Sequence, residues 1–90
     1  MLNSMSRYSV VIETSARNEL KRLPRDMAER LLIKIASLRE EPRPGGVRKI
    51  AGSERTWRVR VRDYRVIYEI DDRESVVTVF RVRLRDKAYD

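Results

Sequence analysis

Three arginines near the centre of the chain have a spacing that suits phosphate binding. Residues 56–62 alternate basic and apolar types, and because successive side chains of a strand point to opposite faces, Arg58 and Arg60 share one face. If residues 62–63 form a two-residue turn, Arg60 lies opposite Arg65 on the next strand. A planar guanidinium can hold a phosphate through two hydrogen bonds. The pattern therefore predicts a phosphate cradle, and the alternative is the solvated face of an antiparallel sheet.

A second basic segment lies near the C-terminus. Basic residues recur from Arg81 to Lys87, with Arg83 and Arg85 between them, and Tyr89 follows. Residues at a chain end are commonly poorly ordered. The alternative is that this segment lies over the arginine face and completes a site. The residues by themselves leave both alternatives open.

Composition restricts the chemistry further. The chain has 90 residues and a net charge of +7, with neither cysteine nor histidine. Disulfides, thiol nucleophiles, thiolate metal sites and an imidazole base are therefore excluded. The paired carboxylates Asp71 and Asp72 fall where a hairpin turn is expected, so they predict a turn and not a metal site. The charge indicates a polyanion such as nucleic acid as partner, and we expect no metal and no cofactor.

The elements that must position these arginines form an α+β fold. β-Branched and aromatic residues predict a strand over 7–13, and helical spacing of apolar residues predicts two helices that meet at Pro24. The second helix is expected to end at Glu40, before a loop rich in proline and glycine. Short connections then predict an antiparallel meander. The predicted order is β-α-α-β-β-β-β, with later strands at 47–50, 56–62, 64–71 and 75–83.

The length fits a single domain, predicted over residues 7–90. Met5 offers a second start, so residues 1–6 are expected to be a disordered extension. The sequence has no apolar run of the roughly 18 residues that a membrane span needs and no signal-peptide pattern, so we expect a cytoplasmic protein with no membrane partner.

Two motifs resemble the RelE branch of the RelE/ParE superfamily of bacterial toxins. One is the strand Tyr64-Arg65-Val66-Ile67-Tyr68, and the other is the basic segment from Val82 that ends at Tyr89. The upstream strand, helical hairpin and Pro/Gly loop agree with this family. The resemblance extends from Arg7 to Tyr89, which is nearly the whole chain.

The resemblance implies the toxin of a type II toxin–antitoxin system. Such a RelE-like toxin is a ribosome-dependent mRNA endoribonuclease that inhibits translation, and a cognate antitoxin neutralises it in a heterotetramer or higher assembly. In its metal-independent reaction the ribose 2′-hydroxyl attacks the adjacent phosphate. The products are a 2′,3′-cyclic phosphate and a free 5′-hydroxyl. This chemistry suits a chain without histidine or cysteine.

The resemblance also implies roles for individual residues. Arg65 matches the motif arginine that would hold the scissile phosphate. Arg85 matches an arginine that would donate a proton to the leaving group or stabilise it. Tyr89 matches a terminal tyrosine that would act as a base or position the 2′-hydroxyl, since clustered positive charge lowers the pKa of a tyrosine. These three are the expected catalytic residues.

Four further residues are expected to bind RNA phosphates: Arg58, Arg60, Arg83 and Lys49. Relatives often have lysine at the first two positions, and many have glycine and histidine where this chain has Arg83 and Leu84. Arginine stays protonated and cannot serve readily as a base. The identity of the general base therefore stays open.

Two other functions fit the same sequence. A ParE-like protein would poison DNA gyrase without cutting RNA, although such proteins generally lack the basic segment that ends in tyrosine. A catalytically weak relative would only bind its antitoxin. The antitoxin is a partner in all three cases, expected to lay a helix in an apolar groove, whereas the ribosome and mRNA are partners of the nuclease alone.

Overall fold

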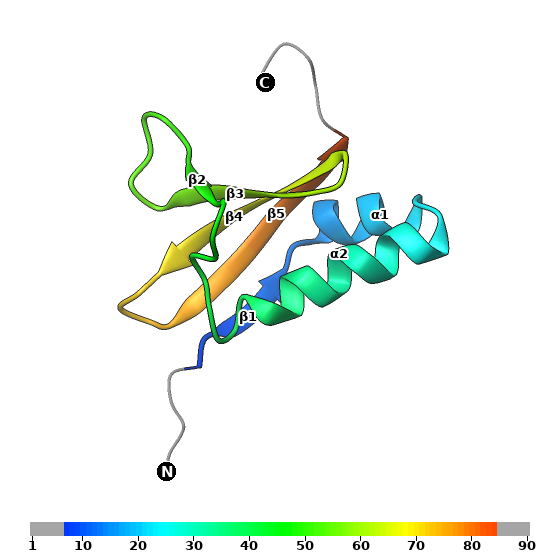
Figure 1. Ribbon diagram of the computed structural model, residues 1–90. Helices are drawn as coiled ribbons and strands as arrows, with labels where there is room; N and C mark the ends of the chain where they lie inside the picture. The colour runs from blue at the N-terminus through cyan, green and yellow to red at the C-terminus, as the bar shows by residue number, and fades with distance from the viewer. Residues whose placement is uncertain (1–6, 85–90) are drawn as a thin grey trace.

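The computed structural model describes residues 7–84, which form a five-stranded sheet with two helices on one side (Figure 1). The α+β order predicted from the sequence is confirmed. Residues 1–6, predicted as an extension, and residues 85–90 lie outside the described part. The elements are β1 (Ser9–Ile12), α1 (Thr14–Lys21), α2 (Arg25–Ser37), β2 (Arg48–Lys49), β3 (Thr56–Val61), β4 (Tyr64–Asp71) and β5 (Val76–Leu84).

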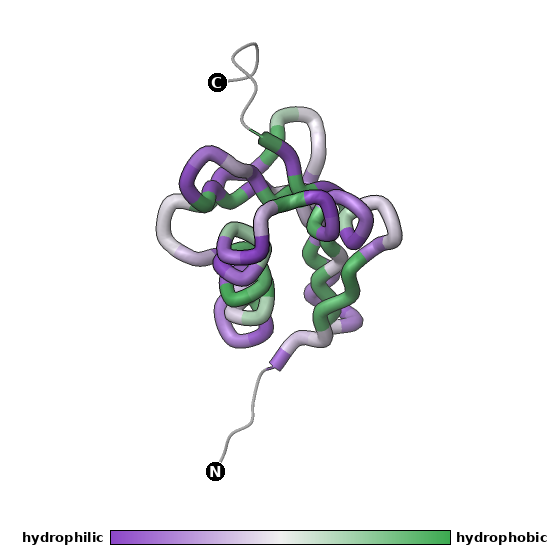
Figure 2. Tube along the Cα trace, turned by 90° about the vertical axis from the view of Figure 1, so that its right-hand side faces the viewer, coloured by the Kyte–Doolittle hydropathy of each residue, from purple (hydrophilic) through white to green (hydrophobic). Residues whose placement is uncertain are grey.

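Both helices bury a single stripe of apolar residues. Ala16 and Leu20 are the buried residues of α1, and Leu31 and Ile35 are those of α2. Figure 2 shows hydrophobic and hydrophilic residues alternating along the helices, as expected for elements with one covered side. Pro24 immediately precedes α2, where its fixed φ suits a helix start. With 8 and 13 residues, the two helices described are too short to cross a membrane.

The second helix ends earlier than the sequence predicts. It stops at Ser37, so the expected end at Glu40 was wrong. The amide of Glu40 donates to the carbonyl of Ser37 at 3.2 Å, the i to i−3 bond of a tightened final turn. Leu38 in this turn is fully buried. Burial of Leu38 against the sheet thus accompanies a change of backbone direction that helical spacing cannot predict.

The sheet has the order β1-β5-β4-β3-β2. Strands β2 to β5 pair antiparallel, which confirms the predicted meander. Strand β1 pairs parallel with β5, and Ser9 lies opposite Val76. The first and last strands of the described chain are therefore neighbours, and β4 lies at the centre of the sheet.

The register between β3 and β4 agrees with the prediction. Residues 62–63 form the two-residue connection, and Arg60 lies opposite Arg65. One face of this hairpin is buried beneath the helices, with Val59 exposed by 3 % and Val66 and Tyr68 by 0 %. The arginines project from the opposite face.

A polar network fixes the loop between α2 and β2. The Tyr68 hydroxyl donates to the carbonyl of Pro42 at 2.7 Å. The next residue, Arg43, donates to both carboxylate oxygens of Asp72, at 3.3 and 2.8 Å. The Tyr8 hydroxyl donates to the same carboxylate at 2.7 Å. The start of β1, the loop and the β4–β5 turn are thereby joined, and the loop leads directly into β2.

The pKa values of this network follow from its contacts. Hydrogen bonds from Arg43 and Tyr8 hold the pKa of Asp72 below its usual value. Burial raises the pKa of Tyr68 to about 12. Both groups are therefore fixed at neutral pH, Asp72 as a carboxylate and Tyr68 as a neutral donor.

The two carboxylates predicted to form a turn have different contacts. Asp71 Oδ1 accepts a hydrogen bond from the amide of Glu74 at 3.0 Å, a bond typical of aspartate in a turn. Asp72 instead makes the long-range contacts to Tyr8 and Arg43. The turn prediction is confirmed, and Asp72 additionally connects distant segments.

Candidate functional site

Three arginines lie in one row across three adjacent strands. Arg60 on β3 lies opposite Arg65 on β4, which lies opposite Arg83 on β5. We call Arg60, Arg65 and Arg83 the arginine row. Adjacent strands are about 4.8 Å apart, so three guanidiniums emerge within about 10 Å. Like charges in such positions destabilise a sheet, and a row of this kind therefore favours an anionic ligand.

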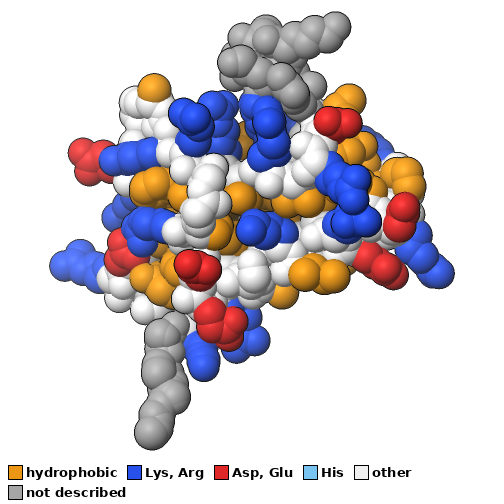
Figure 3. Space-filling model, viewed as in Figure 1, with side chains coloured by type: hydrophobic (Ala, Val, Ile, Leu, Met, Phe, Trp, Pro, Cys, Tyr) orange, Lys and Arg blue, Asp and Glu red, His pale blue; other side chains and the backbone are white. Residues whose placement is uncertain are grey.

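A second pair of cations lies two residues away along the strands. Arg48 on β2 lies opposite Arg58 on β3, which lies opposite Ile67 on β4. Side chains two residues apart on a strand share a face, so Arg58 projects from the same side as the arginine row. We call this side of the sheet, opposite the helices, the cationic face. Figure 3 shows basic side chains spread over one view of the molecule, with hydrophobic side chains exposed between them.

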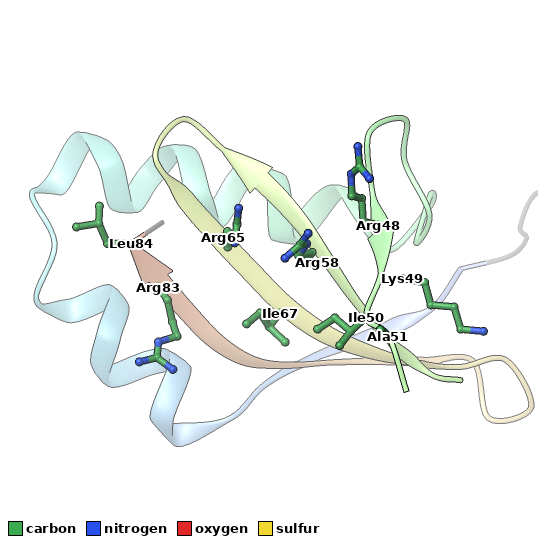
Figure 4. A pocket seen from close by; sticks show the side chains of 9 residues that line it. All are labelled: Arg48, Lys49, Ile50, Ala51, Arg58, Arg65, Ile67, Arg83 and Leu84. Carbon is green, nitrogen blue, oxygen red and sulfur yellow. The ribbon is translucent and has the colours of Figure 1, made fainter. Parts of the chain in front are cut away.

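The cationic face contains an open groove of about 880 Å³. This volume is in the range of small-ligand sites. Its lining combines four arginines with apolar side chains, and Figure 4 shows Ile67 and Ile50 side by side below Arg65, Arg58 and Arg48. The lining residues are Arg48, Lys49, Ile50, Ala51, Arg58, Arg65, Ile67, Arg83 and Leu84.

The described residues that line the groove include basic and apolar side chains and no carboxylate. On β4 the same alternation that exposes Arg65 and Ile67 places Glu69 on the cationic face, at its far end. Guanidiniums stay protonated throughout the physiological range. The groove therefore presents permanent positive charge.

Of the two arginines of β5, Arg83 lines the groove and Arg81 does not. The register between β4 and β5 shifts between Ile67 and Tyr68. Arg81 contacts α1, where its guanidinium meets the Glu19 carboxylate at 3.0 Å. Glu19 also accepts a hydrogen bond from the amide of Val82 at 2.6 Å. Arg81 is thus held by an acidic partner, whereas Arg83 joins the groove.

The structure brings together most of the predicted phosphate-binding residues. Arg58, Arg65 and Arg83 all line the groove. Arg60 belongs to the same face and the arginine row but is absent from the lining. Lys49 borders the groove, yet its side chain points away from the arginines in Figure 4. The other two predicted site residues, Arg85 and Tyr89, lie outside the described residues.

The groove also contains residues that were not predicted as site residues. Alternation on β4 had placed Ile67 on the arginine face, so its position was predictable although its role was not. Placing Arg48 opposite Arg58 required the register between β2 and β3, which two residues of strand cannot specify. Ile50, Ala51 and Leu84 complete the apolar part of the lining.

The arrangement suits a ligand that carries several phosphates. Two rows of guanidiniums can contact more than one phosphate, and their planar forks match phosphate oxygens. Among residues 7–84, no group of three or more carboxylate, cysteine or histidine side chains is placed to hold a metal ion. The guanidiniums of this face can themselves stabilise a phosphate.

The chain is similar to known toxins over almost its whole length. Residues 10–89 match the family of the ParE toxin of the type II toxin–antitoxin system parDE. Toxin RelG from Mycobacterium tuberculosis is 35 % identical over 86 residues, which are 91 % of this chain and 95 % of that protein.

Solved structures show the same fold. RelE in the RelE–RelB complex of Pyrococcus horikoshii has a TM-score of 0.81 at 29 % identity, covering 91 % of this chain and 99 % of the other. The toxin–antitoxin complex RelBE2 of M. tuberculosis gives a TM-score of 0.78 at 28 % identity, covering 89 % and 100 %. A sheet with a basic face, a match over residues 10–89 and these structural neighbours agree on one assignment. The chain belongs to the RelE/ParE family and is the toxin of a type II toxin–antitoxin system.

Proposed function

We propose that this toxin is an endoribonuclease that cuts mRNA on the ribosome and so inhibits translation. The observation that carries the proposal is the arginine row on the cationic face, with a groove beside it. Three guanidiniums in register repel one another, and each can hold a phosphate through two hydrogen bonds. An RNA backbone would offset that repulsion through charge-assisted hydrogen bonds.

The reaction requires three operations on the RNA. The 2′-oxygen loses its proton and forms a bond to phosphorus, the bond from phosphorus to the 5′-oxygen breaks, and the 5′-oxygen gains a proton. The phosphate gains negative charge in the transition state, and preorganised donors stabilise that charge. Arg65, at the centre of the arginine row, is the residue we assign to the scissile phosphate.

The other groups follow from the family resemblance. Arg85 would stabilise or protonate the leaving 5′-oxygen, and Tyr89 would position or deprotonate the 2′-hydroxyl. Arg58, Arg60 and Arg83 would bind the phosphates. Because Arg58 and Arg60 stay protonated, they supply charge and not a base.

We further propose that a cognate antitoxin binds this toxin in the cytoplasm. Several structural neighbours are complexes with RelB, including those from P. horikoshii and M. tuberculosis. A helix laid in an apolar groove is the expected binding mode, within a heterotetramer or larger assembly. The ribosome and mRNA are the partners of the active toxin.

A second candidate function is poisoning of DNA gyrase without RNA cleavage. The match of residues 10–89 to the ParE toxin family favours it. The cationic face would then bind DNA or an acidic protein surface. A catalytically weak toxin that only binds its antitoxin is the remaining alternative, supported by arginine in place of the strand lysines.

Primer extension on a reporter mRNA in a purified translation system tests the proposal. We expect cuts within codons at the ribosomal A site, lost in Arg65→Ala. Arg30→Ala is the matched control, because Arg30 is exposed on α2, on the helix side of the sheet. Intact mRNA with continued translation would contradict nuclease activity. Loss of supercoiling by gyrase in a parallel assay would then support the second candidate.

A further inference from the structure

One position interrupts the pattern of cations on the groove face. Strand alternation places Arg65, Ile67 and Glu69 on the same side of β4. Ile67 lies opposite Arg58 on β3 and Arg81 on β5. An apolar, β-branched residue therefore stands at the centre of a charged surface and remains partly exposed to the groove.

Ile67 is part of a small apolar floor. Ile50 and Ala51, from the segment after β2, line the same groove. In Figure 4, Ile50 lies beside Ile67, with Arg83 on the other side of Ile67 and Arg58 close to it. Both isoleucines are half-buried, so each keeps apolar surface toward the groove. The site is an apolar patch bordered by guanidiniums.

The spacing of the arginines around this patch indicates what kind of ligand it can bind. The arginine row and the pair Arg48–Arg58 are two residues apart along the strands, which is about 6.6 Å. That separation is on the scale of one nucleotide step in an extended strand. A site for inorganic phosphate alone would need no apolar floor, whereas an unpaired nucleotide has both an anionic backbone and a flat apolar ring.

We propose that Ile67 and Ile50 form a seat for one unpaired nucleobase, next to Arg58 and Arg48 and beside the arginine row, and that these two sets of arginines bind the flanking phosphates. This inference rests on the proposed function, because it assigns a single-stranded polynucleotide to the same groove. The base packs one face on the isoleucines, and neighbouring guanidiniums can stack on its other face or donate hydrogen bonds to its edge. Contact with a ring face is tolerant of base identity.

Binding of two oligonucleotides tests this seat. The first is a short, dye-labelled single strand of 2′-deoxynucleotides, which cannot be cleaved without a 2′-hydroxyl. The second has the same phosphates but no bases. With the purified toxin, we expect fluorescence anisotropy to give about tenfold tighter binding of the first, because one face of a base buries apolar surface on the isoleucines.

Variants locate the effect. Ile67→Ala should reduce the preference for the base-bearing strand to about twofold and leave the affinity for the abasic strand unchanged, because only the seat is lost. Ile67→Thr keeps a β-branched residue on β4, so it serves if the alanine variant does not fold. Ile33→Ala is the matched control, since it removes the same groups from a residue that is 71 % exposed on α2. Arg58→Gln should weaken both strands equally.

Equal affinity of the wild-type toxin for the two strands would overturn the seat, as would an unchanged preference in a folded Ile67 variant. Failure to bind either strand would overturn it too. Primer extension with the same preparation separates this result from the proposed function. Cleaved mRNA without base preference refutes only the seat, whereas intact mRNA with a clear base preference refutes only the nuclease.

Discussion

Two neighbouring rows of the same three strands differ completely in chemistry. The arginine row lies directly beside a row of valines, which projects toward the helices. The valines are exposed by 4 % or less, whereas the arginine row faces the solvent side of the sheet. One residue step along each strand therefore separates groups that stabilise the fold from groups that oppose it. The members of the valine row are Val59, Val66 and Val82.

The two rows contribute to stability in opposite directions. The valine row gains stability from burial, at about 25 cal/mol for each Å² of apolar surface. Repulsion between like charges in the arginine row lowers the stability of the fold by a few tenths of a kcal/mol for each pair. A surface that lowers stability is retained when it performs a function.

Placing a charged residue in the valine row should change the free energy of unfolding more than any other substitution considered. Val59→Arg places a charge beneath the helices, which costs several kcal/mol and is comparable to the whole stability of a small domain. We expect this variant to be unfolded. Arg60→Thr, one residue further along β3, should change the free energy of unfolding by about 0.5 kcal/mol or less. Urea denaturation followed by circular dichroism measures both, and a folded Val59→Arg would refute the assignment of the faces.

Alkaline pH should destabilise the helix-covered face of the sheet. The pKa of Tyr68 is about 12 in the folded protein because of burial, against an ordinary value of 10.0. A raised pKa means that the stabilisation is complete below pH 10 and is lost as the pH rises toward 12. Two pH units correspond to at most about 2–3 kcal/mol.

The comparison of wild type with Tyr68→Phe isolates this effect, since other groups titrate in both proteins. The variant should be less stable at neutral pH by about 1 kcal/mol, because the carbonyl of Pro42 loses its donor. Its stability should then fall less steeply above pH 10. Parallel curves for the two proteins would show that Tyr68 ionises normally.

Neutralising one cation should give the smallest change in stability. Arg58→Gln removes the repulsion with Arg48 on the next strand and should raise the free energy of unfolding by a few tenths of a kcal/mol. It should also reduce the slope of log affinity against log salt by about 0.7 for a single-stranded nucleic acid. Arg30→Gln on α2 should leave the slope unchanged. An unchanged slope in Arg58→Gln would remove this residue from the binding surface.

The β3–β4 hairpin was predictable because its signals are local. Alternation fixes the two faces, and a two-residue connection fixes the register, so Arg60 opposite Arg65 followed from the sequence. The central part of the candidate site, Arg58 and Arg65, came from the same reasoning. Short-range rules of this kind apply wherever the strands are regular.

Features that depend on distant contacts were not predictable. Period-two counting along β5 places Arg81 and Arg83 on one face, and it cannot predict that Glu19 on α1 binds Arg81. Asp72 contacts Tyr8 and Arg43, which lie 64 and 29 residues away in the sequence. No local pattern predicts partners at such separations.

The parallel pairing of β1 with β5 has a consequence for synthesis of the toxin. Ser9 to Ile12 pair with residues 76 to 79. Strand β1 therefore cannot form this pairing until almost all of the described chain has been translated. Contacts so distant in sequence slow folding, because a long loop must close before they form. Arg83 also becomes available only at that stage. A partly synthesised chain therefore lacks the complete cationic face, which delays the appearance of the toxin's proposed RNA-binding surface until β5 has been translated.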